Sequence, residues 1–186
     1  ADTGDAYRVG VGQRTHHVRK AECSRILTLD WAMGKPKRDA ATKQVLEGEL
    51  TGDHTAFVIA DLDPEGRLFL LYCLNERIPM GQNAPRLAEV CRRWNPIMVA
   101  GDDDNLSETM VLETRRFRDI PTIKPMGIKS KNKLTRSQAA IVRAERGKVY
   151  LPYDDSPEWV ETLCDQLASF TGADGLTLSN TAHLRV

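Results

Sequence analysis

The sequence lacks the features that mark several common classes of protein. No apolar stretch approaches the roughly 20 residues that a membrane-spanning helix needs, and the first residues contain no apolar core of a signal peptide. We therefore expect a cytoplasmic protein with no membrane partner. A G-x-S-x-G motif and a G-x-x-x-x-G-K-[ST] phosphate loop are also missing, so serine-hydrolase chemistry and ATP hydrolysis are not expected.

Cysteine is scarce and charge of one sign does not dominate. The four cysteines are Cys23, Cys73, Cys91 and Cys164. They lie far apart with no C-x-x-C pair, so we expect reduced thiols rather than disulfides or zinc ligands. With 26 basic and 26 acidic side chains the formal net charge is zero. Any affinity for nucleic acid must therefore come from an uneven distribution of charge.

The 186 residues fit one domain, with 1–24 as a flexible lead-in and 25–186 as the domain itself. Apolar periodicity predicts strands at about 26–31, 55–61, 67–73, 96–101, 121–125 and 148–152, and helices at about 83–94, 105–117, 132–146 and 157–170. Residues 32–53 contain glycine, proline and many charges, which favours a long loop with a short helical turn near 40–47.

The order of these elements predicts the fold class. Asp63, Pro64 and Gly66 separate two strands and are typical of a turn, so these strands should form an antiparallel hairpin. A hairpin followed by alternating helices and strands favours an α/β domain, in which helices cover a mixed sheet.

Carboxylates follow two of the expected strands. Asp30 lies in the apolar run 26–31, and the run 96–101 is followed by three aspartates. The three are Asp102, Asp103 and Asp104. Carboxylates at the ends of buried strands are costly unless a cation lies between them, which predicts a divalent-metal site. One alternative remains open: such aspartates can also turn the chain or cap a helix.

A second candidate feature is a concentration of positive charge between residues 124 and 148. Lys129 and Lys131 fall in a glycine-containing loop, and Lys133 and Arg136 stand three apart on one side of the following helix. Three further cations, Arg143, Arg146 and Lys148, come after them. Such a cluster suits contacts with DNA phosphates that do not depend on sequence, although a solvated surface would have the same composition.

Several segments together resemble one protein family. They are 26–32, a first strand with a metal-binding Asp; 51–56, a Gly-Asp-x-Thr-Ala segment; 103–105, an acidic-x-Asn stretch; 133–136, a Lys-x-x-Arg helix; 145–149, a glycine-to-strand turn; and 159–170, a helix that leads to a last motif. In order and spacing they resemble the C-terminal nuclease domain of the large terminase subunit of tailed bacteriophages, a member of the RNase H-like superfamily.

This resemblance implies an RNase H-like mixed sheet, an antiparallel hairpin plus parallel strands, covered by helices. It also implies that Asp30 and Asp103 bind Mg²⁺ or Mn²⁺, with Asp102 in reserve. The last family motif differs here, because Ser179, Asn180 and His183 occupy positions that are acidic in the family. Asn180 and His183 can still coordinate a cation, but neither adds negative charge, so magnesium should bind more weakly.

The implied function is that of a metal-dependent DNA endonuclease that cuts viral DNA during genome packaging in a bacterial host cell. Double-stranded DNA, an ATPase motor domain, a small terminase subunit and the capsid portal are the partners that the resemblance implies. A catalytically weakened or dead DNA-binding or packaging module is the alternative. A junction resolvase or an RNA–DNA hybrid nuclease is a third possibility, because a fold does not fix a substrate.

Overall fold

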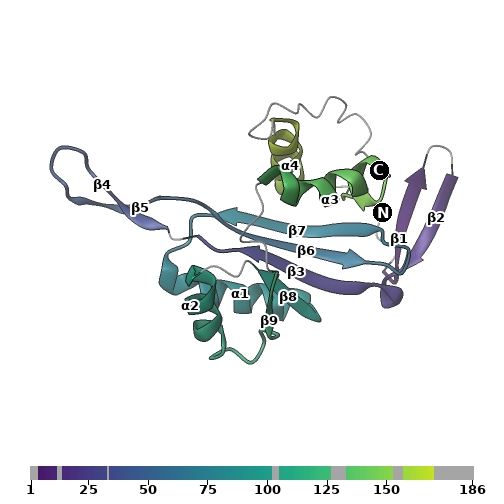
Figure 1. Ribbon diagram of the computed structural model, residues 1–186, viewed down its shortest axis with the longest axis horizontal. Coiled ribbons are helices and arrows are strands. Elements are labelled where there is room, and N and C mark those ends of the chain that lie inside the picture. The colour runs from purple at the N-terminus through teal and green to yellow at the C-terminus, as the bar shows by residue number, and fades with distance from the viewer. Residues whose placement is uncertain are drawn as a thin grey trace. The chain divides into compact units, whose positions relative to one another are not determined.

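The computed structural model describes residues 4–11, 14–32, 34–101, 105–126, 133–152 and 157–169. Within these residues the chain is a mixed α/β protein with four α-helices, a six-stranded sheet and two small antiparallel sheets (Figure 1). The strands are β1 (Ala6–Val11), β2 (Arg14–Arg19), β3 (Ser24–Asp30), β4 (Lys35–Arg38), β5 (Val45–Thr51), β6 (Thr55–Leu62), β7 (Leu68–Glu76), β8 (Met98–Gly101), β9 (Ile123–Pro125) and β10 (Val149–Tyr150). The helices are α1 (Met80–Trp94), α2 (Asn105–Thr114), α3 (Lys133–Glu145), α4 (Glu158–Ser169) and the short 3-10 helix η1 (Lys20–Glu22).

The strand order of the large sheet is β10-β7-β6-β3-β8-β9. Three of its pairs are parallel: β10 with β7, β3 with β8, and β8 with β9. Strands β6 and β7 are neighbours joined by residues 63–67. Because so short a connection cannot cross over, these two strands are antiparallel, as the sequence predicts. At the turn, the Gly66 N–H donates to the Asp63 carbonyl at 3.1 Å.

The chain divides into two compact units, which are described separately. Unit 1 comprises Ala1–Arg25, Ala60–Cys73 and Ser130–Val186, and unit 2 comprises Ile26–Ile59 and Leu74–Lys129. In unit 2, α1 buries Ala84, Leu87, Ala88 and Cys91, whose spacing of three and four residues forms one helix face. The helix ends at Asn95, which has a left-handed conformation with φ 48° and donates its N–H to the Cys91 carbonyl.

The first 24 residues are not a loose lead-in, which corrects the expectation from sequence. Strands β1 and β2 pair antiparallel there, with Tyr7 opposite Val18. Val9 and Val18 are buried with Phe69 and Tyr150 in the core of unit 1. The Phe69 ring stacks on Tyr7 with centroids 4.5 Å apart and on Tyr150 at 5.0 Å. Aromatic stacking and apolar burial therefore stabilise this hairpin.

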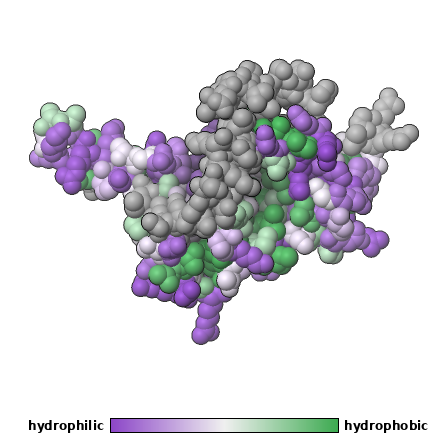
Figure 2. All heavy atoms as spheres, in the orientation of Figure 1, coloured by the Kyte–Doolittle hydropathy of each residue, from purple (hydrophilic) through white to green (hydrophobic). Residues whose placement is uncertain are grey.

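The expected long loop over 32–53 also needs correction, because β4 and β5 form a two-stranded ribbon there. Residues 40–42 make the turn, and the Lys43 N–H donates to the Asp39 carbonyl at 3.1 Å, so the short helical turn expected near 40–47 is present as a single i→i+4 turn. The Asp39 carboxylate accepts the N–H groups of Ala41 at 3.0 Å and Thr42 at 2.7 Å, which fixes the turn. The ribbon is mostly hydrophilic, as Figure 2 shows at the left.

The remaining expectations match more closely. The helices predicted at 83–94, 105–117, 132–146 and 157–170 correspond to α1 to α4, with ends shifted by no more than three residues. All four cysteines are free, and Cys91 is buried. Among the described residues, no helix combines the length and the apolar character needed to cross a membrane.

Candidate functional site

The candidate metal site begins where β3 and β8 end side by side in unit 2. The two strands are parallel, and Leu29 lies opposite Gly101. Asp30 is the next residue of β3 and is exposed. Asp102, Asp103 and Asp104 follow Gly101 directly but lie outside the described residues. The register therefore places Asp30 and Gly101, the residue before this acidic segment, at the same edge of the sheet, the one formed by the carboxyl ends of its parallel strands.

Gly101 allows β3 and β8 to pack closely at this edge. A Cβ atom at position 101 would lie 2.5 Å from the Cδ1 atom of Leu29. The Leu29 side chain is itself buried, so it has little room to move away. Glycine is thus required here for close packing rather than for an unusual backbone conformation.

Strand β9 ends at the same edge. Pro125 lies opposite Gly101, and the Met126 N–H donates to the Gly101 carbonyl at 2.9 Å. The predicted DNA-binding loop with Lys129 and Lys131 follows Met126, although residues 127–132 lie outside the described residues. The basic loop therefore follows a residue that is hydrogen-bonded to the end of β8.

A neutral, buried hydrogen-bond network fixes the backbone just after Asp30. The Ala32 N–H donates to the Thr55 hydroxyl oxygen at 3.1 Å. The Ala32 carbonyl accepts from the Asn83 amide at 3.2 Å, and Asn83 Oδ1 lies 3.0 Å from the Thr55 hydroxyl. Thr55 and Asn83 are 0 % and 1 % exposed. We call these three residues the Ala32 bracket.

The residue between Asp30 and the bracket is also held. Trp31 is buried and packs edge-on against Phe57, with ring centroids 5.6 Å apart and planes at 89°. The chain that follows Asp30 is therefore held by both apolar and polar contacts. A side chain that must coordinate a metal benefits from such a fixed backbone.

The other predicted site residues are not brought to this edge within the described residues. Asn180 and His183 lie outside them, and Lys133 and Arg136 begin α3 in unit 1, where their side chains are not described. No group of three or more His, Cys, Asp or Glu side chains within the described residues could hold a metal ion. Asp30 is thus the one predicted ligand whose position the structure describes.

Sequence reasoning missed a charged cluster buried in unit 1. The Arg25 guanidinium donates to both carboxylate oxygens of Asp61, at 2.8 and 2.9 Å. The Tyr7 hydroxyl donates to the same carboxylate. Asp61 is 1 % exposed. The hydrogen bond to Asp61 raises the pKa of Arg25, while burial and the Asp61 contact raise the pKa of Tyr7.

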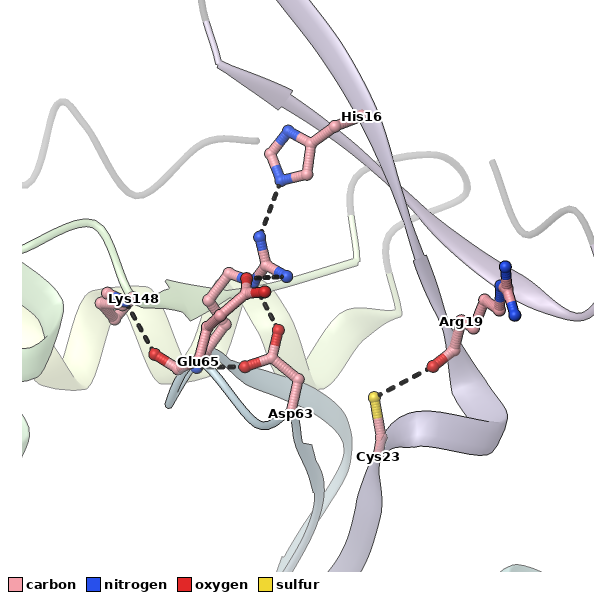
Figure 3. Close-up of polar contacts among 7 residues, drawn as sticks. His16, Arg19, Cys23, Asp63, Glu65 and Lys148 are labelled. Carbon is pink, nitrogen blue, oxygen red and sulfur yellow. Dashed lines mark hydrogen bonds and ion pairs between the residues drawn. The ribbon is translucent and has the colours of Figure 1, made fainter.

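A second acidic residue of this cluster, Asp63, pairs with Arg67 at the β6–β7 turn (Figure 3). Arg67 also contacts Glu65, and its Nη1 atom lies 3.1 Å from His16 Nε2. Because arginine only donates, His16 Nε2 is the acceptor of this contact. Burial alone would raise the pKa of Asp63, but hydrogen bonds from the Arg67 side chain and backbone lower it below its ordinary value.

Cys23 lies near these carboxylates but is not an activated nucleophile. Burial, Asp61 and Asp63 together raise the pKa of its thiol, which donates to the Arg19 carbonyl at 3.5 Å (Figure 3). A reactive cysteine needs the opposite shift, a lowered pKa.

Hydrogen bonds between β1 or β2 and β6 cannot be predicted from local sequence, because Tyr7 and Asp61 are 54 residues apart.

Comparison with protein-family models, with curated proteins and with solved structures finds no match.

Proposed function

We propose that this protein is a metal-dependent DNA endonuclease with an RNase H-like fold, of the kind found in the nuclease domain of large terminase subunits. One observation carries the proposal: β3 and β8 are parallel neighbours, and Leu29 lies opposite Gly101. Asp30 and Gly101, the residue before Asp102, therefore lie at one edge of the sheet. In α/β sheets, functional residues gather at the carboxyl ends of parallel strands.

The residues at this edge suit a hard divalent cation. Asp30 is exposed at the end of its strand, and carboxylate oxygen is the ligand that Mg²⁺ and Mn²⁺ favour. Asp30 and Asp103 would hold the metal, with Asp102 in reserve and Asn180 and His183 as weaker contributors. When bound, the metal would polarise a phosphate oxygen and activate water. The Ala32 bracket would keep the Asp30 backbone in place.

The basic segment supports DNA as the substrate. Its loop with Lys129 and Lys131 follows Met126 in the chain, and the Met126 N–H donates to the carbonyl of Gly101, the last residue of β8. Lys129, Lys131, Lys133 and Arg136 would contact the phosphates of the duplex. The ATPase motor, the small terminase subunit, the portal and a bacterial host cytoplasm belong to the proposal through the resemblance alone.

Plasmid cleavage tests this function. The protein should nick or linearise supercoiled plasmid, more readily with Mn²⁺ than with Mg²⁺, because Mn²⁺ accepts nitrogen ligands better. Asp30→Asn should abolish cleavage without unfolding the protein. Glu76→Gln is a matched control, since Glu76 is also an exposed carboxylate at the end of a strand. Cleavage that survives both Asp30→Asn and EDTA would contradict the proposal.

A packaging module without catalysis is the second candidate, and Ser179, Asn180 and His183 favour it because they replace acidic family positions. The change of all three residues to Asp should raise Mg²⁺-dependent cleavage above that of the starting protein, because each carboxylate lowers the cost of holding the ion. Replacement of Ser179 and His183 by Asn adds no charge and is the control. Duplex binding without cleavage in either protein would support the module.

A further inference from the structure

A groove in unit 1 runs along the second half of α3, beside the β6–β7 turn. Its volume is about 610 Å³. It is lined by Glu65, Gly66, Gln138, Ala139, Val142, Arg143, Arg146 and Lys148. This volume falls in the range of ordinary ligand sites. Glu65 and Lys148 are both shown in Figure 3.

The end of α3 holds the cations of this groove in a fixed arrangement. The Gly147 N–H donates to the Ala144 carbonyl at 2.9 Å, and the Lys148 N–H donates to the Arg143 carbonyl at 3.0 Å. Gly147 has φ 63°, so the pair of bonds forms a Schellman motif that closes the helix. Arg143, Arg146 and Lys148 consequently lie around one short, well-defined turn.

The groove is positively charged after its internal pairs are counted. Its one acidic residue, Glu65, already pairs with Arg67, which is not part of the lining. Lys148 Nζ donates to the Glu65 carbonyl at 2.7 Å, which leaves two further donors on that ammonium. Among the described residues, neither Arg143 nor Arg146 forms an ion pair.

The lining of the groove also has an apolar part. Ala139 is exposed, Val142 is 41 % exposed, and Gly66 presents no side chain. A lining with both apolar and cationic side chains fits a ligand that joins an uncharged sugar to phosphate groups. It fits a small inorganic anion less well, because the apolar side chains offer that ion no hydrogen bond.

We propose that this α3 groove binds the sugar–phosphate backbone of nucleic acid, with Arg143, Arg146 and Lys148 on the phosphates and Ala139 and Val142 against the sugar. The inference rests on the proposed function, which it deepens by adding a second phosphate contact region. Arg143 follows Arg136 by seven residues, two turns of helix. The competing explanation is that Arg143 and Arg146 only complement the negative end of the helix dipole.

Duplex binding in EDTA tests the groove separately from cleavage. The double variant Arg143→Gln with Arg146→Gln should lose about tenfold or more in affinity for a labelled 20-base-pair duplex, and its salt slope should fall by about two units. Arg115→Gln with Arg118→Gln is the matched control, because these exposed arginines of unit 2 are also three residues apart. Equal losses in the two double variants, or no loss in the first, would overturn the proposal.

A substitution at Ala139, in the apolar part of the lining, gives an independent test of duplex binding at the groove. Ala139→Glu should weaken duplex binding several-fold more than Ala139→Gln, which has the same size without the charge. Inorganic phosphate, titrated into the protein, distinguishes the source of the anion. If phosphate at millimolar concentration binds the groove and the arginine variant still binds duplex normally, the groove is a small-anion site and the proposal fails. Duplex binding at the groove without any cleavage would instead contradict only the nuclease.

Discussion

The two units satisfy the hydrogen bonds of their buried polar groups in different ways. Unit 2 buries the neutral Ala32 bracket, in which a hydroxyl and an amide satisfy one another and the backbone of Ala32. Unit 1 buries two carboxylates, Asp61 and Asp63, each with an arginine partner. A neutral network keeps its hydrogen bonds at any ordinary pH, whereas an ionised pair depends on the charge of its members.

The two clusters hold different parts of the chain in place. The bracket fixes the chain beside Asp30, where the proposed metal site would need the same geometry at every pH at which metal binds. The charged cluster instead connects β1 and β2 to the β6–β7 region through Tyr7 and His16. The stability of unit 1 should therefore be more sensitive than that of unit 2 to acid and to the loss of a single charged partner.

The largest effect should come from removal of one member of the Arg25–Asp61 pair. Asp61→Ala leaves a partly buried guanidinium and the Tyr7 hydroxyl without their acceptor, and should lower the free energy of unfolding by about 3 kcal/mol. Urea unfolding measures this. The double variant Arg25→Met with Asp61→Leu should recover much of the loss. A double variant that is less stable than Asp61→Ala would show that the ionic pair itself stabilises the unit.

A smaller loss is expected from the neutral bracket. Thr55→Val keeps the shape of the side chain but removes the acceptor of the Ala32 N–H, and should cost about 1–3 kcal/mol. Hydrogen exchange should show faster exchange at the Ala32 amide. Thr55→Ser, which keeps the hydroxyl, is the control. If Thr55→Val leaves exchange at Ala32 unchanged, the bracket does not fix this backbone.

The smallest expected effect is a difference in how the stability contributions of the charged cluster and of the Ala32 bracket depend on pH. Because the pKa of Asp63 in the folded protein lies below its ordinary value, its stabilisation is complete above the unfolded pKa of about 3.9 and declines as the pH falls through the folded pKa. Asp63→Asn should therefore flatten the loss of stability between pH 5 and pH 3. The deficit of Thr55→Val should be the same at both pH values. A pH-dependent deficit in Thr55→Val would contradict the distinction between the clusters.

Local signals in the sequence were sufficient for much of the fold. The Asp63 to Gly66 turn, the helix faces and the strand that ends at Asp30 each depend on neighbouring residues, and each is present in the structure. The hairpin of β1 and β2 was missed although Tyr7 and Val9 alternate with polar residues, because the core against which they pack includes Phe69 and Tyr150, which lie far away in the sequence. In so short an alternating strand, the neighbouring residues do not show which side chains are buried.

The candidate site shows the same division. Asp30 and the three aspartates after Gly101 could be proposed from strand ends, whereas the choice of Asp103 among them came from the family resemblance. In the structure Leu29 lies opposite Gly101, the residue before Asp102. Asn83 could not be found from sequence, since its partner Thr55 is 28 residues away and an asparagine in a helix carries no sign of its contact. Long-range polar partners become visible only in three dimensions.

The most direct test of the proposed metal site is paramagnetic broadening of amide resonances by Mn²⁺. Substoichiometric Mn²⁺ should broaden the amides of Asp30, Gly101 and Met126 at the edge of β3, β8 and β9 before those of described residues elsewhere in the protein, and Asp30→Asn should remove this effect. Broadening that centres instead on the carboxylates of unit 1, such as Glu65, and that persists unchanged in Asp30→Asn would contradict a metal site at this edge.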